Sequence, residues 1–373
     1  MRFRTGIFVS LLLLLTGCGK ETGIPEPVSA PILFEVAATG AFTRAAGEIN
    51  DDAALRGRSI GVFAAYTGKF TYENTTVSAD YMYNQEVRYT TNNLWEYEPV
   101  KYWPNDPEDY VSFFAYAPYE ADPQDDGRPI FGISRKVDLG DPWINFRLPP
   151  YSEQIDLLYG QRYSGGSFSP WLDQKKAAWN DARMLFTFKH ALACIGDGIS
   201  VKMSDALFAN MQNTVNITIT RVQIEYRNLT TKARLVLRCE DTPNWKEIIS
   251  GELNCTREFD SGVLTGKMFS KDATANPEPI TLDSGHGLFY IPLRIAGMPQ
   301  MEAIITLSYM VSDGTSPEMT NSAVSTVKFN PAEAGSRQAF AITLTEDLDI
   351  KVTVITESPG ITMPGDLTPQ TGF

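Results

Sequence analysis

Few side chains of this sequence are arranged as acid–base or nucleophilic catalysis requires. The two histidines, His190 and His286, lie far apart in the sequence, which removes most histidine-based catalysis and most zinc chemistry. Ser325 and Lys328 have the spacing of the S-x-x-K motif, which needs a helix to bring its two side chains together. The surrounding residues alternate as in a β-strand, where Ser325 and Lys328 face opposite sides. We therefore expect no enzyme activity and no cofactor.

One acidic loop begins as a calcium-binding loop does. The run Asp122-Pro-Gln-Asp-Asp-Gly127 supplies carboxylates, but the twelfth position holds Ile133 instead of the glutamate that completes such a site. We expect a solvated acidic loop without a metal ion.

The residue with the clearest chemistry is Cys18. It follows Leu15, Thr16 and Gly17, and this run resembles the bacterial lipobox, in which a cysteine is acylated and becomes the first residue of the mature chain. Upstream, positive residues precede an apolar run at 7–15, which as a helix rises about 13 Å, whereas a bilayer core is roughly 30 Å thick. We expect a lipoprotein signal peptide at 1–17 and anchoring of Cys18 in the outer membrane; a plain signal peptide is the alternative.

The other cysteines have less defined roles. Cys194 shares strand parity with Phe186 and Phe188 and is expected to be a small core residue. Cys239 and Cys255 could form a disulfide in an oxidising compartment, but three cysteines leave one unpaired, so the question stays open.

Composition limits the possible partners. The chain has 373 residues with 32 Lys and Arg against 45 Asp and Glu, a formal net charge of −13. This acidic balance argues against nucleic acid as a partner, because phosphate contacts need Lys and Arg. Hydrophobic residues make up 43% of the chain, as in a folded protein, and the length favours two domains.

Two-residue periodicity recurs along the chain and predicts an all-β fold. The alternating runs are 59–66, 110–117, 184–193, 215–226, 234–238, 303–311, 338–344 and 348–356. Only two short helices are expected, at 173–179 and 205–212. Many short strands with polar turns favour β-sandwiches. We expect a tether at 18–44, one sandwich at 45–182 and a second at 183–373.

Aromatic residues are concentrated between Trp95 and Tyr119. Exposed, they could form a platform that stacks on sugar rings; buried, they would form a sandwich core. We favour the core, because aromatic side chains dominate protein cores. His190 is likewise expected to be a hydrogen-bonded core residue.

Several segments resemble the fimbrillin family of Bacteroidales, the subunits of their surface fimbriae. The most specific stretch is Tyr83-Asn84, Val87-Arg-Tyr89, Leu94-Trp-Glu-Tyr97, Lys101-Tyr-Trp-Pro104 and Val111-Ser-Phe-Phe-Ala-Tyr-Ala-Pro118. Asp156-Leu-Leu158 and Phe186-Thr-Phe-Lys-His-Ala-Leu192 resemble a second family marker. The resemblance implies two transthyretin-like β-sandwich domains, export as a lipoprotein and polymerisation by strand exchange.

The resemblance also implies a processing event. Family members are cut after an arginine by a trypsin-like, arginine-specific protease, and Arg44-Ala45 matches that position. Ile32, Phe34 and Val36 alternate upstream of it, and could form a strand that fills a groove of the first domain, here called the plug strand. Cutting would remove the lipid anchor and the plug strand together, and the open groove would accept a strand from another fimbrial subunit.

The strand that would enter this groove, here called the donor strand, is less defined. Leu348, Ile350, Val352 and Val354 alternate and could leave their own sheet. Sequence alone leaves stalk, tip and anchor subunits open. A monomeric surface lipoprotein that binds a glycan or a host ligand is the alternative function; it would keep its lipid and need no cleavage.

Overall fold

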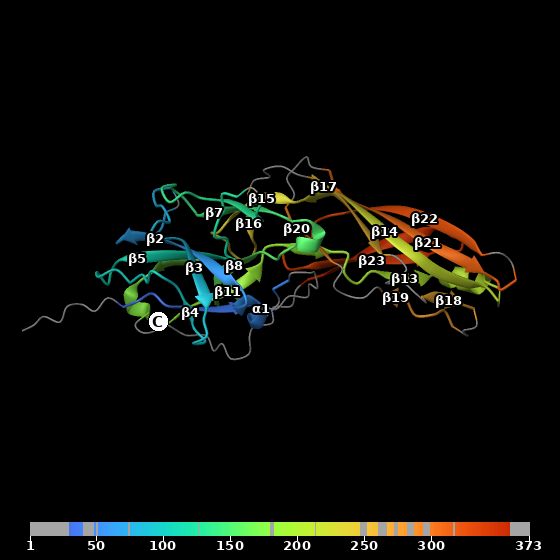
Figure 1. Ribbon diagram of the computed structural model, residues 1–373, viewed down its shortest axis with the longest axis horizontal. Helices are drawn as coiled ribbons and strands as arrows, with labels where there is room; N and C mark the ends of the chain where they lie inside the picture. The colour runs from blue at the N-terminus through green and yellow to red at the C-terminus, as the bar shows by residue number, and fades with distance from the viewer. Residues whose placement is uncertain are drawn as a thin grey trace, which may run out of the picture.

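The structure, a computed structural model, describes most of the chain between residues 30 and 358. The described residues are 30–39, 48–49, 51–73, 75–125, 127–179, 183–212, 214–246, 252–259, 267–271, 275–281, 287–293, 299–315 and 318–358. For 252–259 only the backbone is described. Cys18, Arg44 and Ala45 lie outside the described residues. Figure 1 shows two lobes along the long axis, one containing β2, β3 and β5, and the other β14, β21 and β22.

In the first lobe, nine described strands form one sheet in the spatial order β10-β5-β2-β3-β4-β1-β11-β8-β9. Their bounds are β1 (Phe34–Ala38), β2 (Ser59–Gly68), β3 (Met82–Tyr89), β4 (Trp95–Glu96), β5 (Tyr110–Ala117), β8 (Leu158–Ser164), β9 (Ser167–Ser169), β10 (Trp171–Gln174) and β11 (Met184–His190). The strands predicted at 59–66 and 110–117 are β2 and β5 and are therefore confirmed.

This sheet closes on itself. Strand β5 pairs with β2 along its length and also with β8, through the registers Ala115–Gly160, Tyr116–Tyr159 and Ala117–Leu158. Seven strands thereby form a hydrogen-bonded ring, in the order β5-β2-β3-β4-β1-β11-β8 and back to β5. We call this ring the barrel. Because a closed sheet has no edge, removing one of these strands would create two edges at once.

Alternate side chains of the barrel strands fill its interior, as the two-residue period of a strand requires. The buried interior residues include Phe34, Val36, Ile60, Val62, Val111, Phe113, Phe186 and Phe188. The aromatic region belongs to the same core, since Trp95, Trp103 and Phe113 are at most 2% exposed. The prediction that these aromatics form a core is confirmed, with Tyr102 a half-exposed exception.

A smaller sheet covers the outside of the barrel. It has the order β16-β15-β7-β6 among the described strands, with bounds β6 (Ile130–Ile133), β7 (Trp143–Arg147), β15 (Lys232–Val236) and β16 (Asn244–Trp245). Its inner side chains, such as Ile144, Phe146 and Leu235, are buried and share one hydrophobic cluster with Phe114 and Tyr116 on the outer side of β5. Figure 1 shows β15 and β16 beside β7 in the first lobe.

The described sheets do not divide at residue 182, where the sequence predicts a domain boundary. Strand β11, which follows residue 182, belongs to the barrel. Strands β15 and β16 follow β14 (Asn216–Thr230) in the sequence, yet they lie in the first lobe, whereas β14 lies in the second. Residues 164–179 hold turns within one sheet, because β9 and β10 both pair with barrel strands. Polar turns mark the ends of strands and do not by themselves separate domains.

Two further sheets form the second lobe. One has the described order β17-β14-β21-β22, with β18 also paired to β14, and the other has the order β19-β13-β23-β12-β20, with β24 paired to β23. The bounds are β12 (Ala193–Ile195), β13 (Ser200–Met203), β17 (Glu252–Phe259), β18 (Met268–Ser270), β19 (Ile280–Thr281), β20 (Leu288–Tyr290), β21 (Met301–Ser312), β22 (Met319–Phe329), β23 (Arg337–Leu344) and β24 (Ile350–Glu357). Buried rings such as Tyr226 and Phe340, 6.2 Å apart, pack in the shared core.

Helices contribute little to the described fold. The helix expected at 205–212 is α2 (Asp205–Asn210), which Ser204 caps by accepting a hydrogen bond from the Leu207 N–H. The segment expected as a helix at 173–179 contains the end of β10 and a 3-10 turn, Lys176–Trp179. The sequence analysis did not predict α1 (Asp52–Arg56) or the 3-10 turn at Tyr151–Glu153. None of the helices in the described ranges is long and apolar enough to cross a membrane.

Candidate functional site

The predicted plug strand is strand β1 of the barrel. It runs parallel to β11, with Phe34 opposite Met184 and Ala38 opposite Phe188. On its other side it meets β4 at Trp95, and the Ile32 N–H donates to the Lys101 carbonyl at 2.9 Å. β1 therefore lies between β4 and β11, and without it these two strands would have unpaired edges.

The side chains of this strand reach far into the barrel. Ile32, Phe34 and Val36 are 0%, 0% and 4% exposed, so their predicted common face is buried. The Phe34 ring lies 6.0 Å from Phe113 on β5, which is not a neighbour of β1 in the ring of strands. It also lies 5.7 Å from Phe186. Phe34 thus contacts both its neighbour and the opposite wall.

Polar contacts hold both ends of the same segment. At its start, the Tyr97 hydroxyl donates to the Ile32 carbonyl at 2.9 Å. At its end, the Ala38 N–H donates to a carboxylate oxygen of Asp52 at 2.7 Å, in the first turn of α1. In the middle of the segment, burial raises the pKa of Glu35. The positive charges of Arg183 and Arg56 lower this pKa, but by less than burial raises it.

The strand ends beside a buried His–Asp pair. The Thr39 N–H donates to the Phe188 carbonyl at 2.9 Å, two residues before His190. His190 Nδ1 lies 2.7 Å from Asp156 Oδ2, and this oxygen also accepts a hydrogen bond from the Ile49 N–H at 3.2 Å. Thr39 and Ile49 flank the segment that contains Arg44 and Ala45, so both described ends of that segment lie at this pair.

The predicted donor strand is β24, with one correction. It begins at Ile350 and not at Leu348, because Leu348 has a φ of 61° in the turn before the strand and is 39% exposed. Ile350, Val352 and Val354 pack against the core of the second lobe. In the described part of the chain β24 pairs only with β23, and it is therefore an edge strand.

One arginine holds the far end of β24. Arg337 Nη1 lies 3.0 Å from Asp197 Oδ2, and Nη2 makes an ion pair with Glu357, the last residue of β24. The Asp197 side chain is fully buried. Strand β1 belongs to the barrel sheet and β24 to a sheet of the second lobe. The structure thus does not bring the predicted plug strand and the predicted donor strand together into one site.

The two cysteines whose side chains the structure describes, Cys194 and Cys239, are buried free thiols. Cys239 is a buried free thiol that donates to the Val236 carbonyl at 3.1 Å. The disulfide with Cys255 that the sequence left open is therefore absent in this structure. Burial raises the pKa of Cys239 to about 12. Cys194 is fully buried, as expected for a small core residue, and nowhere among the described residues do three His, Cys, Asp or Glu side chains gather to hold a metal ion.

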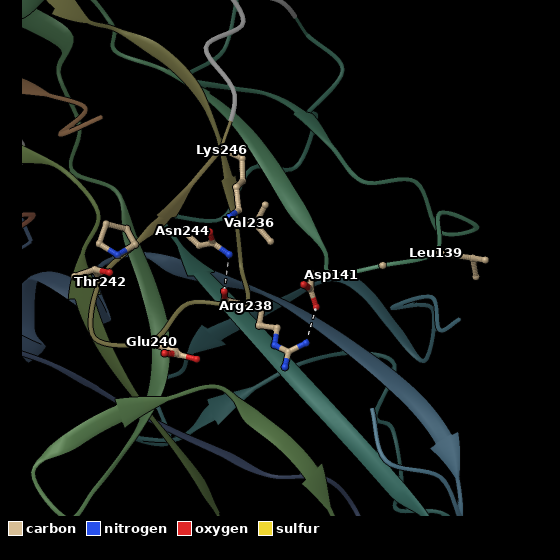
Figure 2. Close-up of a pocket in the computed structure, with 10 residues that line it drawn as sticks. Leu139, Asp141, Val236, Arg238, Glu240, Thr242, Asn244 and Lys246 are labelled. Carbon is tan, nitrogen blue, oxygen red and sulfur yellow. Dashed lines mark hydrogen bonds and ion pairs between the residues drawn. The ribbon is translucent and has the colours of Figure 1, made fainter. Parts of the chain in front are cut away.

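A polar pocket, which the sequence did not suggest, opens beside β15 and β16. It has a volume of about 680 Å³ and is lined by Leu139, Gly140, Asp141, Val236, Arg238, Glu240, Thr242, Pro243, Asn244 and Lys246. Figure 2 shows Arg238 directed toward Asp141, 3.8 Å away, and the Asn244 amide donating to the Arg238 carbonyl at 3.0 Å. Behind them the Tyr72 hydroxyl donates to Asp141 at 3.1 Å. These residues come from two segments about a hundred residues apart, so no local motif identifies the pocket.

Three comparisons place this geometry among known proteins. The model of a family described as Fimbrillin-like matches residues 43–358. Fimbrium subunit Fim1C of Phocaeicola vulgatus is 24% identical over 335 residues, with 82% of each chain covered. The crystal structure of a fimbrial protein from Bacteroides vulgatus superimposes with a TM-score of 0.63 at 21% identity, covering 88% of this chain and 99% of that one. This last similarity establishes a shared fold.

Proposed function

Since this chain belongs to the fimbrillin-like family, we propose that it is a fimbrial subunit that is exported as a lipoprotein, cut after Arg44 and assembled by strand exchange. The coarser conclusion, a structural subunit of cell-surface fimbriae, follows from family membership and from the related fimbrium subunit. The observation that carries the finer proposal is the position of β1, a strand that closes the barrel and directly precedes the segment with Arg44.

The first step is export and anchoring. The lipobox-like run before Cys18 supports acylation of its thiol and attachment to the outer membrane. Residues 19–29 contain four prolines or glycines and suit a tether between lipid and barrel. The protein would then wait at the cell surface with β1 in place and its barrel closed.

The second step is the cut after Arg44. A trypsin-like protease needs an accessible arginine, and Arg44 lies between two residues whose backbones are fixed, Thr39 and Ile49. Downstream of the cut, Ile49 and Leu55 are at most 2% exposed and would keep the new N-terminus on the lobe. Upstream of the cut, the lipid-anchored piece would be held to the protein by the non-covalent contacts of β1 and its flanking residues.

The third step is exchange of β1 for a strand of another subunit. Loss of β1 would expose the edges of β4 and β11 and the pockets of three apolar side chains, each worth roughly 1.5–3 kcal/mol when buried. A donor strand that restores these contacts would replace β1 by donor-strand complementation. Because donation from one subunit to the next does not close, it would produce a filament.

Strand β24 is the donor that the contacts favour. Among the described strands it pairs with β23 alone, so a single ladder of backbone hydrogen bonds joins it to its sheet. Its Ile350, Val352 and Val354 alternate as Ile32, Phe34 and Val36 do in β1, and would present apolar side chains to the same side of a groove. A stalk subunit would use both its groove and its β24 strand. A subunit that uses only one of them would lie at an end of the filament, as a tip or an anchor.

The deciding experiment is limited digestion of the unlipidated mature chain with an arginine-specific protease. We expect a cut after Arg44 and then multimers that survive mild detergent and appear as filaments in electron microscopy. Arg44→Ala should abolish both the cut and the multimers, whereas Arg58→Ala, which removes an exposed arginine next to β2, should change neither. A protein that is cut after Arg44, with Ala45 confirmed as the new N-terminus, yet stays monomeric would contradict strand exchange.

Anchoring needs a separate test, because assembly and lipidation can fail independently. Cells that express the full chain would be labelled with a palmitate analogue. Cys18→Ala should abolish the label, and Cys239→Ala, which changes a buried free thiol, should retain it. Equal labelling of the Cys18→Ala variant would show that the signal is not a lipobox. The alternative function, a monomeric glycan-binding lipoprotein, would be supported if the label were present and assembly were absent.

A further inference from the structure

The ring of Phe34 occupies a space with aromatic walls. Its centre lies 5.6 Å from the ring of Tyr97, 6.0 Å from that of Phe113 and 5.7 Å from that of Phe186. Tyr97 directly follows β4, and the other two rings belong to β5 and β11. Because none of the three walls lies on β1, all of them would remain in the barrel after β1 has left. We call the space that Phe34 fills between these rings the aromatic pocket.

The walls of the aromatic pocket are themselves packed from behind. Phe113 lies edge-on against the buried Trp103, with the ring centres 5.8 Å apart. On the other side, a Cβ atom at Gly160 would lie 3.0 Å from Phe186 Cδ1, so no space is left behind that ring. A pocket with such walls does not shrink around a smaller side chain, and the difference in volume stays empty. A donor strand without a ring at this position would therefore leave a cavity in the barrel.

Strand β24 matches β1 at every compared position except this one. Both strands direct three alternate residues toward their own cores. These residues are Ile32, Phe34 and Val36 in β1, and Ile350, Val352 and Val354 in β24. Aligned in the same direction, the two strands have isoleucine at the first position and valine at the third. They differ only in the middle, where β24 has Val352 in place of the phenylalanine that fills the aromatic pocket.

No other register of β24 supplies the missing ring. Residues 348–357 contain no aromatic residue, so the aromatic pocket would lack a ring whichever direction the strand takes. A shift by two residues would place Ile350 in the pocket, which is still smaller than phenylalanine. A shift by one residue would turn the opposite face inward and bury the charge of Lys351 in an apolar interior, which is costly. The mismatch is therefore a property of the strand and not of one alignment.

We propose that the aromatic pocket selects the donor strand, and that its preferred occupant is a strand of a different fimbrial subunit with an aromatic residue at the position of Phe34. β-Branched residues two positions before and after the ring would fill the places of Ile32 and Val36. This inference rests on the proposed strand exchange and adds which strand the groove prefers. Purified protein offers its groove only strands of its own chain, so β24 still enters there, but with a poorer fit than the preferred donor.

The test measures how tightly synthetic strands enter the unlipidated mature chain after the cut behind Arg44, at protein concentrations too low for multimers. Fluorescent peptides of residues 30–39 (the β1 peptide) and 349–358 (the β24 peptide) are incubated with the cut protein, and gel filtration separates bound from free peptide. Phe34→Val in the β1 peptide should weaken binding by about tenfold or more, because the pocket loses its ring. Val352→Phe in the β24 peptide should strengthen binding by about the same factor, because it reproduces the β1 pattern. The substitutions lie in the peptides and leave the folding of the chain unchanged.

The matched control is Thr353→Phe in the β24 peptide, which adds the same ring to the opposite face of the strand. Its affinity should change less than about twofold, because turning that ring into the pocket would also turn Lys351 inward. Equal gains from Val352→Phe and Thr353→Phe, or equal binding of the two β1 peptides, would overturn the selection by the aromatic pocket while leaving strand exchange intact. If even the unaltered β1 peptide does not enter the cut chain, strand exchange itself is refuted, and the selection with it.

Discussion

His190 Nδ1 lies 2.7 Å from Asp156 Oδ2, and both side chains are buried. The same carboxylate oxygen accepts the Ile49 N–H, so one buried pair connects β11 to the residues that follow the segment with Arg44. Breaking a buried ion pair by removing one partner leaves the other group buried without compensation, which is costly. The pair therefore couples the stability of the first lobe to the charge of one imidazole.

The first prediction concerns pH. Burial is the largest influence on His190 and lowers its pKa, but Asp156, by its charge and its hydrogen bond, with Glu48 and the Thr39 backbone, raises the pKa to a net value above the usual 6.5. Stability from a raised pKa is fully present below pH 6.5 and is lost as the pH rises through the folded-state pKa. We expect the protein to melt at a progressively lower temperature, relative to His190→Gln, as the pH increases from 6 to 9.

The control for this pH dependence is the second histidine of the sequence. His286→Gln should keep the pH dependence of the wild-type protein, measured by thermal melts in a series of buffers at constant ionic strength. If the difference between wild type and His190→Gln stays constant over the whole range, the His190–Asp156 pair does not change its charge in this window.

The second prediction concerns the ring that spans the barrel. Phe34→Ala should lower the free energy of unfolding by about 3–5 kcal/mol, because it removes the contacts to Phe113 and Phe186 and leaves a cavity. Phe70→Ala is a matched control, since Phe70 is 80% exposed, and should stay within about 0.5 kcal/mol of wild type. Urea denaturation measures both. A loss as small as that of Phe70→Ala would mean that the barrel is stable without a filled β1 position.

Sequence reasoning identified strands better than it identified their partners. The alternation of Ile32, Phe34 and Val36 specified which side chains are buried, because burial of one face imposes a two-residue period. It could not specify that β1 lies parallel to β11, which is about 150 residues away. The alternating pattern also placed the start of the last strand at Leu348, which is two residues too early. Leu348 lies in a turn in which the Thr345 N–H donates to the Asp349 carbonyl. The pocket combines two distant segments and left no local signal.

The third prediction concerns the end of β24. Glu357→Gln removes the charge that pairs with Arg337 while leaving the buried Asp197 contact intact. Because a half-exposed ion pair contributes on the order of 1 kcal/mol or less, the protein should remain folded but exchange the β24 amide hydrogens faster. Hydrogen exchange followed by mass spectrometry measures this change. Asp347→Asn alters an exposed carboxylate in the turn before β24 and should leave the exchange unchanged.

The same variant tests the donor role of β24. If β24 must leave β23 before it enters a neighbouring barrel, faster opening should accelerate multimer formation of the protein cut after Arg44. Faster amide exchange with an unchanged assembly rate would show that another segment is the donor. Comparing the two rates therefore shows whether β24 opens before the subunits join, with no substitution in the groove itself.

The last prediction fixes β1 in place. The β1–β11 register places Glu35 opposite Leu185, and both are half-buried on the side that faces away from the barrel interior. Neighbouring strand positions of this kind are within the range that a disulfide can bridge. The oxidised double variant Glu35→Cys/Leu185→Cys should be cut after Arg44 and yet remain monomeric, because the plug strand stays covalently attached to β11. Adding a reductant should start assembly, while the single variant Glu35→Cys should assemble without it. Assembly of the oxidised double variant at the rate of the single variant would show that β1 does not have to leave, and that the subunits join through a surface other than the barrel groove.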